Sequence, residues 1–425
     1  MAMMESVRAV FRSPGLRNRL LFTLGMLAVF RLGAVIPVPG IDTRVIQELI
    51  DRGGLFGLFD VISGGAFRTM SIFAMSVTPY INASIIVQLL TVVIPRWEEL
   101  SKEGEQGRRK LQEYVRYGTV ILGLIQALGM ALTIRRAGAM LHPDSWTDLF
   151  IIIVTLTAGT AFLMWLGELI TEKGIGNGIS LLIFAGILSR VPRTVKGTVE
   201  LYRVGQVDLF QILLVAVLGV LIVAFTVLVT EGVRRIPVQY ARRTVGRRTL
   251  GGHSTHLPIR VNQAGVIPVI FSQSLLVFPP TVASYFDQTH PVVRWIMDNF
   301  NFRHPWYLIA FALLTIGFTY FYTTITFNPV EVADNIRKAG GIVAGLRPGK
   351  PTADYLAKVS NRLTFVGALF LAGITVLPYA LVAVTQNPNA GIGGTALLIV
   401  VGVAIETMRQ VEAHLVLRQY QGFMR

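Results

Sequence analysis

His253 and His256 are the residues whose type and spacing first suggest a metal site. They stand three apart in the glycine-rich stretch Gly251-Gly252-His253-Ser254-Thr255-His256. Zinc sites in proteins use at least three protein ligands, and no third ligand accompanies this pair in the sequence. A solvated loop is therefore the better interpretation, and we expect neither a metal nor a cofactor.

Few charged residues fall within the long apolar runs of the chain. Arg31 lies past the middle of the first run, and Glu168 and Glu406 lie near the ends of later ones. Ion-coupled transporters place titratable groups at mid-membrane depth, and the later runs have none at their centres. The sequence also lacks a phosphate-binding loop of the Gly-x-x-x-x-Gly-Lys-Ser/Thr type and a Ser/His/Asp cluster. We interpret Arg31 as structural, paired with a neighbouring carbonyl or reaching for the interface. The chain is then a passive conduit driven by another protein, and not an enzyme.

The elements that hold these residues belong to a membrane protein. The sequence is 52% hydrophobic and 15% charged, its mean hydropathy is +0.58, and it contains no cysteine. A helix needs about 20 apolar residues to cross a bilayer, and runs of that kind recur along the whole chain. We predict an all-α polytopic membrane protein with ten transmembrane helices, near residues 20–38, 72–94, 115–134, 149–170, 179–191, 209–230, 264–286, 306–327, 363–384 and 395–408.

Basic residues orient these helices. Most of the 39 Lys and Arg residues fall on the side that would hold both termini, so the positive-inside rule places both termini in the cytoplasm. The loop 190–208 is the exception, with four basic residues outside. Ten helices divide into an N-terminal half, 1–191, and a C-terminal half, 192–425, which carries large cytoplasmic loops at 232–262 and 328–361. Five helices per half predict two inverted five-helix halves around a central pore.

Residues 62–94 join a short glycine-bearing piece to a span interrupted by polar side chains. Pro79, Asn82, Ser84 and Gln88 break its apolar surface. Irregular backbone at membrane depth survives only inside protein or beside a water-filled cavity. The stretch is therefore predicted to line or close a pathway.

The chain resembles the SecY family, the channel subunit of the bacterial Sec protein translocase. The resemblance covers essentially the whole sequence and rests on short phrases in family order. They include Arg31-Leu32-Gly33-Ala34, Pro37-Val38-Pro39-Gly40, Ser63-Gly64-Gly65, Pro79-Tyr80-Ile81, Gly174-Ile175-Gly176-Asn177-Gly178, Arg235-Ile236-Pro237-Val238, Ala264-Gly265-Val266-Ile267-Pro268, Gly345-Leu346-Arg347-Pro348-Gly349 and Gly393-Gly394-Thr395. The tail after residue 408 is shorter than in many members, and 132–148 departs from the family pattern, so nothing is carried onto either.

This resemblance implies a protein-conducting channel in the bacterial inner (plasma) membrane. Such a channel passes unfolded secretory chains and releases transmembrane segments sideways into lipid. The implied partners are the SecE and SecG subunits, the SecA motor ATPase, the ribosome, signal peptides, nascent polypeptides and membrane lipids, with no small-molecule substrate.

The resemblance also implies roles for individual residues. The plug would comprise Ser63, Gly64, Gly65, Ala66, Phe67 and Arg68. An aliphatic pore ring, which excludes water by dewetting, would comprise Ile81, Ile85, Ile183, Ile187, Ile270 and Ile399. A lateral gate would carry Gln88, Thr91, Gln273 and Ser274, and partner docking would use Arg242, Arg243, Arg247, Arg248 and Arg347.

Two other classes of function share some of these features. A secondary transporter also has inverted repeats and broken helices, but the missing mid-membrane carboxylates argue against it. A structural or lipid-binding scaffold would not need the short glycine-bearing piece at the start of residues 62–94, or the polar side chains in the span that follows it.

Overall fold

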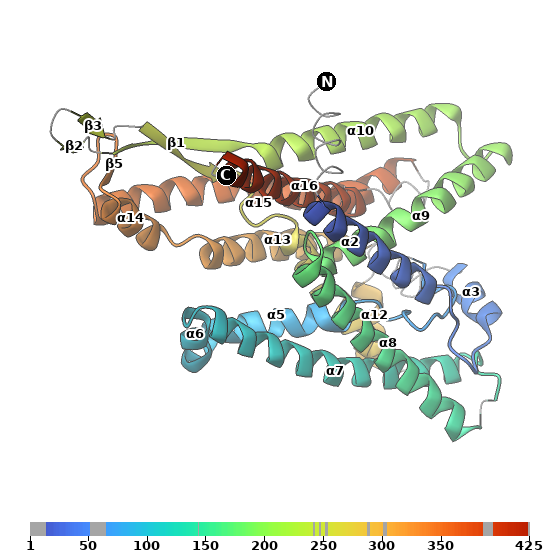
Figure 1. The fold of residues 1–425 in the computed structure, drawn as a ribbon. Helices are drawn as coiled ribbons and strands as arrows, with labels where there is room; N and C mark the ends of the chain where they lie inside the picture. Colours follow the sequence, from blue (N-terminus) through green and yellow to red (C-terminus); the bar gives the residue numbers. More distant parts are fainter. Residues whose placement is uncertain are drawn as a thin grey trace. The chain divides into compact units, whose positions relative to one another are not determined.

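A computed structural model describes residues 14–51, 65–142, 144–240, 243–245, 248–250, 254–286, 290–300, 304–385 and 394–423 (Figure 1). The predicted plug residues Ser63 and Gly64 and the predicted docking residues Arg242 and Arg247 lie outside these ranges. The chain packs as two compact units. The first comprises Met1–Ile212, Gln273–Tyr307 and Val403–Arg425, and the second comprises Leu213–Ser272 and Leu308–Gly402. This division follows packing, whereas the predicted halves 1–191 and 192–425 follow membrane topology and stay a prediction.

The first unit is mainly helical in its described part, with turns over residues 65–77. Its complete helices are α2 (Pro14–Gly33), α3 (Thr43–Asp51), α5 (Thr78–Val93), α6 (Pro95–Lys102), α7 (Glu105–Arg136), α8 (Trp146–Lys173), α9 (Gly178–Arg203) and α12 (Pro291–Asn299). Helix α7 packs between α5 and α8, and α8 also packs against α2 and α9 (Figure 1).

Side-chain caps and glycines explain where these helices begin and end. Ser145 accepts a hydrogen bond from the backbone N–H of Asp148, and Asn177 accepts one from that of Ser180, so each supplies a partner to a free N–H at the start of its helix. Gly174 follows the last residue of α8. The short turn from Gly174 to Asn177 fixes the direction in which α9 leaves α8.

The second unit contains helices and a small sheet. Its elements are most of α10 (Leu209–Glu231), β1 (Val233–Tyr240), β2 (Arg243–Val245), β3 (Arg248–Leu250), β4 (Ser254–Arg260), most of α13 (Pro305–Thr326), α14 (Pro329–Lys338), β5 (Gly341–Val343) and α15 (Lys350–Thr385). Two further helices, α11 (Ile267–Ala283) and α16 (Gly394–Phe423), pass from one unit to the other along the chain.

Strand β1 is the centre of the sheet in the second unit, with β4 and β5 antiparallel to it on its two edges. Ile236 and Val238 alternate inward along β1 and are each 2% exposed. They pack with Ile336 of α14 and Leu356 of α15 in a compact apolar cluster. The two large loops predicted at 232–262 and 328–361 thus fold together on a core of their own, and the predicted all-α fold gains a small sheet there.

Six of the described helices are long and apolar enough to span a membrane, or seven if the bent pair α5 and α6 is counted as one span. Helix α11 is apolar but shorter. Each of the ten predicted spans overlaps a described helix, but length and hydropathy alone do not establish ten crossings. The count of ten therefore stays a prediction.

Predicted spans and observed helices differ at their ends, and two of these differences have a local cause. The second span was predicted to begin at residue 72, but α5 begins at Thr78. Ser76 has a positive φ of 54°, which a helix cannot contain, and Pro79 suits the first helical turn, where no N–H is needed. The fifth span was predicted to end at residue 191, but α9 continues to Arg203 with Pro192 inside it. A membrane helix tolerates such a proline when other groups satisfy the freed backbone.

Candidate functional site

Two of the four described residues of the predicted plug are buried, and the other two, Gly65 and Arg68, are half-buried. Ala66 is 1% exposed and Phe67 is fully buried. Phe67 and Met70 belong to a large apolar cluster that also contains Ala127 and Met130 of α7 and Ile152 of α8. Gly65 has a φ of +89°, which glycine adopts without strain. The segment therefore turns tightly and places an aromatic ring in the core of the first unit.

Hydrogen bonds tie the end of this segment to the chain that leaves α2. The backbone N–H of Val38 donates to the carbonyl of Met70 at 2.8 Å, and that of Ile72 donates to the carbonyl of Ile36 at 3.0 Å. The Thr69 hydroxyl lies 3.2 Å from the carbonyl oxygen of Ala34. Residues from Thr69 onward are thus held by backbone contacts that a moving plug would have to break.

Phe73 holds the residues after Met70 in place through contacts of its aromatic ring. Its ring stacks on Phe30 of α2 and on Phe162 of α8, with centroids 6.1 and 5.8 Å away. A Cβ atom on Gly33 would collide with the Phe73 ring, and one on Gly159 would collide with the carbonyl oxygen of Ile72. Both glycines are therefore needed for this close approach. The part from Ile72 onward is thus held by close contacts with α2 and α8, whereas Ala66 and Phe67 combine apolar packing with local hydrogen bonds from Ser71 and Met70.

The predicted ring residues occupy four helices in two units. Ile81 and Ile85 lie on α5, and both are buried, at 6% and 4% exposure. Ile183 and Ile187 lie on α9, also in the first unit, and both are half-buried. Ile270 on α11 and Ile399 on α16 belong to the second unit. The two isoleucines on α5 are four residues apart, as are the two on α9, so each pair lies on one face of its helix. A ring formed by residues of both units stays a prediction.

The predicted gate residues on α5 are satisfied within their own helix. The Gln88 side-chain amide donates to the Ser84 hydroxyl at 3.2 Å, and the Thr91 hydroxyl donates to the carbonyl of Gln88 at 2.6 Å. Gln273 is half-buried on α11. Ser274, also on α11, is 7% exposed and lines a cavity. Of these four residues, only Ser274 contributes to that cavity.

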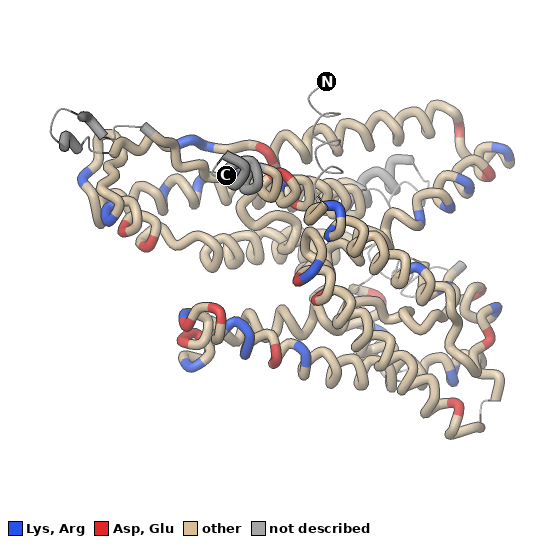
Figure 2. The backbone as a smooth tube through the Cα atoms, viewed as in Figure 1, with Lys and Arg blue, Asp and Glu red and all other residues tan. Residues whose placement is uncertain are grey.

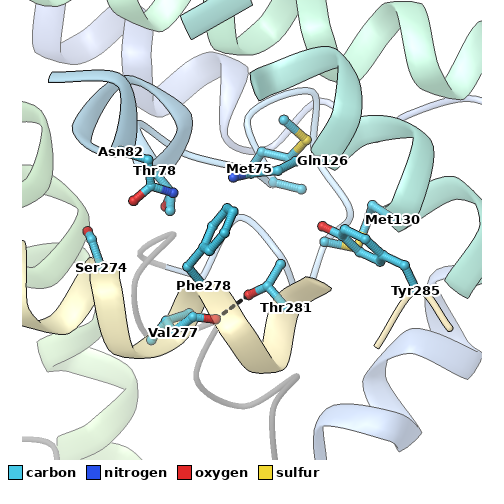
Figure 3. Close-up of a pocket in the computed structure, with 11 residues that line it drawn as sticks. Met75, Thr78, Asn82, Gln126, Met130, Ser274, Val277, Phe278, Thr281 and Tyr285 are labelled. Carbon is cyan, nitrogen blue, oxygen red and sulfur yellow. Dashed lines mark hydrogen bonds between the residues drawn. The ribbon is translucent and has the colours of Figure 1, made fainter. Parts of the chain in front are cut away.

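The cavity lies wholly within the first unit and is lined by α5, α7 and the end of α11 (Figure 3). It holds about 400 Å³ of empty space, part of it open to solvent. Thr78 and Asn82 reach it from α5, Gln126 from α7, and Ser274 and Phe278 from α11 (Figure 3). Asn82 and Gln126 are each 8% exposed. Neither side chain hydrogen-bonds to another described residue.

Unpaired amides in a cavity favour water or a passing polar group. The amide atoms of Asn82 and Gln126 are not among the fully buried atoms that lack a partner, and a cavity with several polar partners can hold ordered water. The interface between α5 and α11 is therefore polar and incompletely packed. A dry apolar seam between two helices would have neither property.

Sequence reasoning missed most residues of this cavity. Thr78 and Asn82 are four apart on α5, and Ser274 and Thr281 are seven apart on α11, so each pair lies on one face of its helix. This spacing of polar residues on apolar helices was a usable signal. Tyr285, which follows α11, and Gln126 offered none, because only the tertiary fold brings them to the cavity.

Arg31 has a structural partner in the first unit. Its guanidinium donates to the Ser189 hydroxyl of α9 at 2.9 Å, and this hydroxyl in turn donates to the carbonyl of Gly186 at 2.7 Å. The prediction expected a carbonyl or the interface, and the contact is to a hydroxyl that relays to a carbonyl. The bond ties the end of α2 to the middle of α9.

The predicted docking residues that the structure describes lie in the second unit. Arg243 and Arg248 are in the hairpin formed by β2 and β3. Arg347 is exposed in the turn between β5 and α15, and its carbonyl accepts the Thr352 hydroxyl at 2.8 Å. The glycines on either side of it, Gly345 and Gly349, have φ values of +81° and +102°. These two turns hold the Arg347 side chain at the surface.

The sequence over residues 71–408 matches the family model described as SecY. The chain belongs to the SecY family. Curated relatives include the protein translocase subunit SecY of Halalkalibacterium halodurans, 49% identical, and that of Bacillus subtilis, 48% identical, and each match covers the whole of both chains. The SecY subunit of Streptomyces scabiei is 45% identical over the same full length.

Solved SecY-like channels share the fold of this chain. A protein-conducting channel superposes with a TM-score of 0.65 at 17% identity, covering 93% of this chain and 92% of that one. Sec61 in the canine ribosome–channel complex superposes with a TM-score of 0.61 at 15% identity, with the same coverage of each chain. The resemblance to the SecY family is thereby confirmed, and with it the fold of a multi-pass membrane channel.

Proposed function

We propose that this chain forms the channel of a bacterial protein translocase. Unfolded secretory polypeptides cross the membrane through it, and transmembrane segments leave it sideways into the bilayer. The observation that carries this proposal is the polar, incompletely packed cavity between α5 and α11, in a chain that belongs to the SecY family. A seam built in this way can separate at low cost and reseal.

The closed state rests on the burial of Phe67. This side chain belongs to the apolar cluster of the first unit, its neighbour Ala66 is also buried, and glycine at 65 provides a turn. In the proposed mechanism a polypeptide displaces the residues before Thr69 and threads past the ring of Ile81, Ile85, Ile183, Ile187, Ile270 and Ile399. An all-apolar ring excludes water and ions by dewetting when no chain is present.

The proposed setting is the bacterial cell membrane, with both termini in the cytoplasm and ten crossings in two inverted halves. SecE and SecG complete the complex, and SecA or the ribosome drives the polypeptide. The folded loops of the second unit, with Arg347 exposed at a turn, are the proposed docking surface for these drivers. A long cytoplasmic loop with its own apolar core presents basic side chains more rigidly than a coil does.

Cross-linking across the cavity tests the lateral gate. The chain has no cysteine, so Asn82→Cys with Ser274→Cys can be joined by a short thiol-specific reagent without background. We expect the cross-linked complex to stop releasing transmembrane segments into lipid, and a cleavable linker to restore release. Normal release from the fully cross-linked complex would rule out separation of α5 and α11 as the exit.

Leu89 provides the matched control. It is 37% exposed on α5 and does not line the cavity, so Leu89→Cys with Ser274→Cys should not cross-link. If the control pair joined as readily as the cavity pair, the cross-linking would report general mobility of α5.

A further inference from the structure

The outer half of α9 carries the basic residues that disagree with the positive-inside rule. Arg193, Lys196 and Arg203 are exposed along it, and Figure 2 shows their blue segments towards the end of the helix. Basic residues on the outer side of a membrane protein work against its orientation. These exposed side chains are therefore available to bind an anionic group on the outer side.

The same stretch of helix has an exposed apolar face beside the basic one. Val191, Val195, Val199 and Tyr202 recur every three or four residues and are 47%, 56%, 42% and 46% exposed. At 100° per residue these four side chains share one face, and the three basic residues share the adjoining face. The exposed apolar side chains suit contact with lipid, and the exposed basic side chains suit contact with an anionic group.

The depth of these residues matches the outer headgroup region. Glu172 and Lys173 end α8 and are exposed, and α9 begins at Gly178 immediately after them, so the cytoplasmic boundary lies close to Gly178. A hydrocarbon core about 30 Å thick corresponds to about 20 helical residues. The outer boundary then falls near residue 198, between Lys196 and Arg203. Long basic side chains reach from such positions to phosphates.

Little on the protein neutralises this basic face. Glu200 is the acid on the same face of α9, and no ion pair joins it to Lys196 or Arg203 among the described residues. Three cations with one acid attract an anionic group, and the apolar stripe beside them suits acyl chains. We propose that the outer half of α9 binds the phosphate headgroup of an anionic phospholipid in the outer leaflet. The proposal rests on the proposed function, because that function fixes which end of α9 is outside.

Brominated lipids test this site on the full chain with its partner subunits. A fluorophore is attached to Val199→Cys, and its fluorescence is quenched by nearby bromine atoms. The protein is placed in vesicles of phosphatidylcholine and phosphatidylglycerol. Two preparations have the same composition and differ only in which of the two lipids is brominated. Attraction near a membrane surface predicts roughly fivefold enrichment for each basic residue in contact. We therefore expect quenching per bromine to be at least about threefold stronger from phosphatidylglycerol.

Three variants separate charge from structure. Arg193→Gln, Lys196→Gln and Arg203→Gln together should equalise the two lipids. The swap Arg193→Lys, Lys196→Arg and Arg203→Lys should keep the preference, and Glu200→Gln should increase it. Equal quenching by the two brominated lipids in the unaltered protein would overturn the proposal. This holds even if the basic face binds an acidic protein in place of a lipid.

Labelling of Gln206→Cys with a membrane-impermeant maleimide distinguishes the two ways to fail. This residue is exposed just beyond α9. Labelling only from the cytoplasmic side would show that the proposed orientation is wrong. Labelling from outside with equal quenching would overturn the lipid site alone and leave the proposed function intact.

Discussion

Replacement of Phe67 by alanine should open the closed channel. The side chain is fully buried in the apolar cluster of the first unit. Burial of a phenylalanine side chain is worth about 1.5–3 kcal/mol, and alanine also leaves a cavity. If Phe67 leaves the core when the plug moves, only the closed state loses this energy. A loss of about 2–3 kcal/mol shifts the ratio of closed to open channels by roughly 30- to 150-fold.

Ion conductance of the reconstituted complex in planar bilayers, without a translocating polypeptide, measures this shift. The frequency of open events should rise by about that factor in Phe67→Ala. Phe67→Leu keeps most of the burial and should change it less than about tenfold.

Phe73 offers a second comparison. Its ring is held between Phe30 and Phe162, in the part of the chain from Ile72 onward. Phe73→Leu should therefore lower thermal stability and leave the conductance unchanged. The reasoning fails if Phe67→Ala lowers thermal stability to the same extent as Phe73→Leu with no change in conductance, because Phe67 would then stay in the core when the channel opens.

Two further substitutions test the ring and the docking surface. Ile399→Asn should wet the proposed constriction and raise ion leak, because dewetting requires an apolar lining; unchanged conductance in the planar bilayer would remove Ile399 from the ring. Arg347→Glu reverses an exposed charge that lies outside the apolar cluster of the second unit. It should block motor-driven transport into vesicles while the assembled complex and its melting temperature stay as in the unaltered protein, and normal transport would exclude Arg347 from docking.

The helices and the class of the protein could be predicted from the sequence because apolar runs of spanning length depend on local composition. The boundaries that failed depended on tertiary contacts. The stretch before Thr78 is apolar enough for a helix, but Ile72 pairs with Ile36 and Phe73 fits against Gly33. Pro192 indicated a break, and α9 passes through it. Local composition cannot show that groups far away in the sequence contact these residues or hydrogen-bond to their backbone.

The site was only partly predictable for a related reason. Ser274 was predicted for the gate and lines the cavity, whereas Gln88 bonds within its own helix. Both are polar residues on apolar helices, and the sequence does not distinguish them. The difference lies in the face each presents, because Asn82 and Ser274 reach the same cavity from α5 and α11 (Figure 3).

The position of that cavity explains why α11 would be the helix that moves. Pro279 and Pro280 lie inside α11, and each removes the N–H that would bond the carbonyl four residues earlier. The carbonyls of Leu275 and Leu276 lose these bonds, and the Thr281 hydroxyl donates to the next carbonyl along, that of Val277, at 2.6 Å. The end of α11 therefore makes fewer backbone hydrogen bonds of its own and lies beside the cavity, while just beyond it Thr133 and Arg136 of α7 donate to the carbonyls of Ser284 and Tyr285.

The other side of α5 is different. A Cβ atom on Gly118 of α7 would lie 3.3 Å from Ala83 of α5, so these two helices already touch closely. Separating them would cost dispersion contacts along a dense seam. Separating α5 from α11 costs less, because the cavity has already forfeited those contacts and water can satisfy Asn82 and Gln126. In the proposed mechanism, opening would therefore follow the seam with α11, where packing is incomplete.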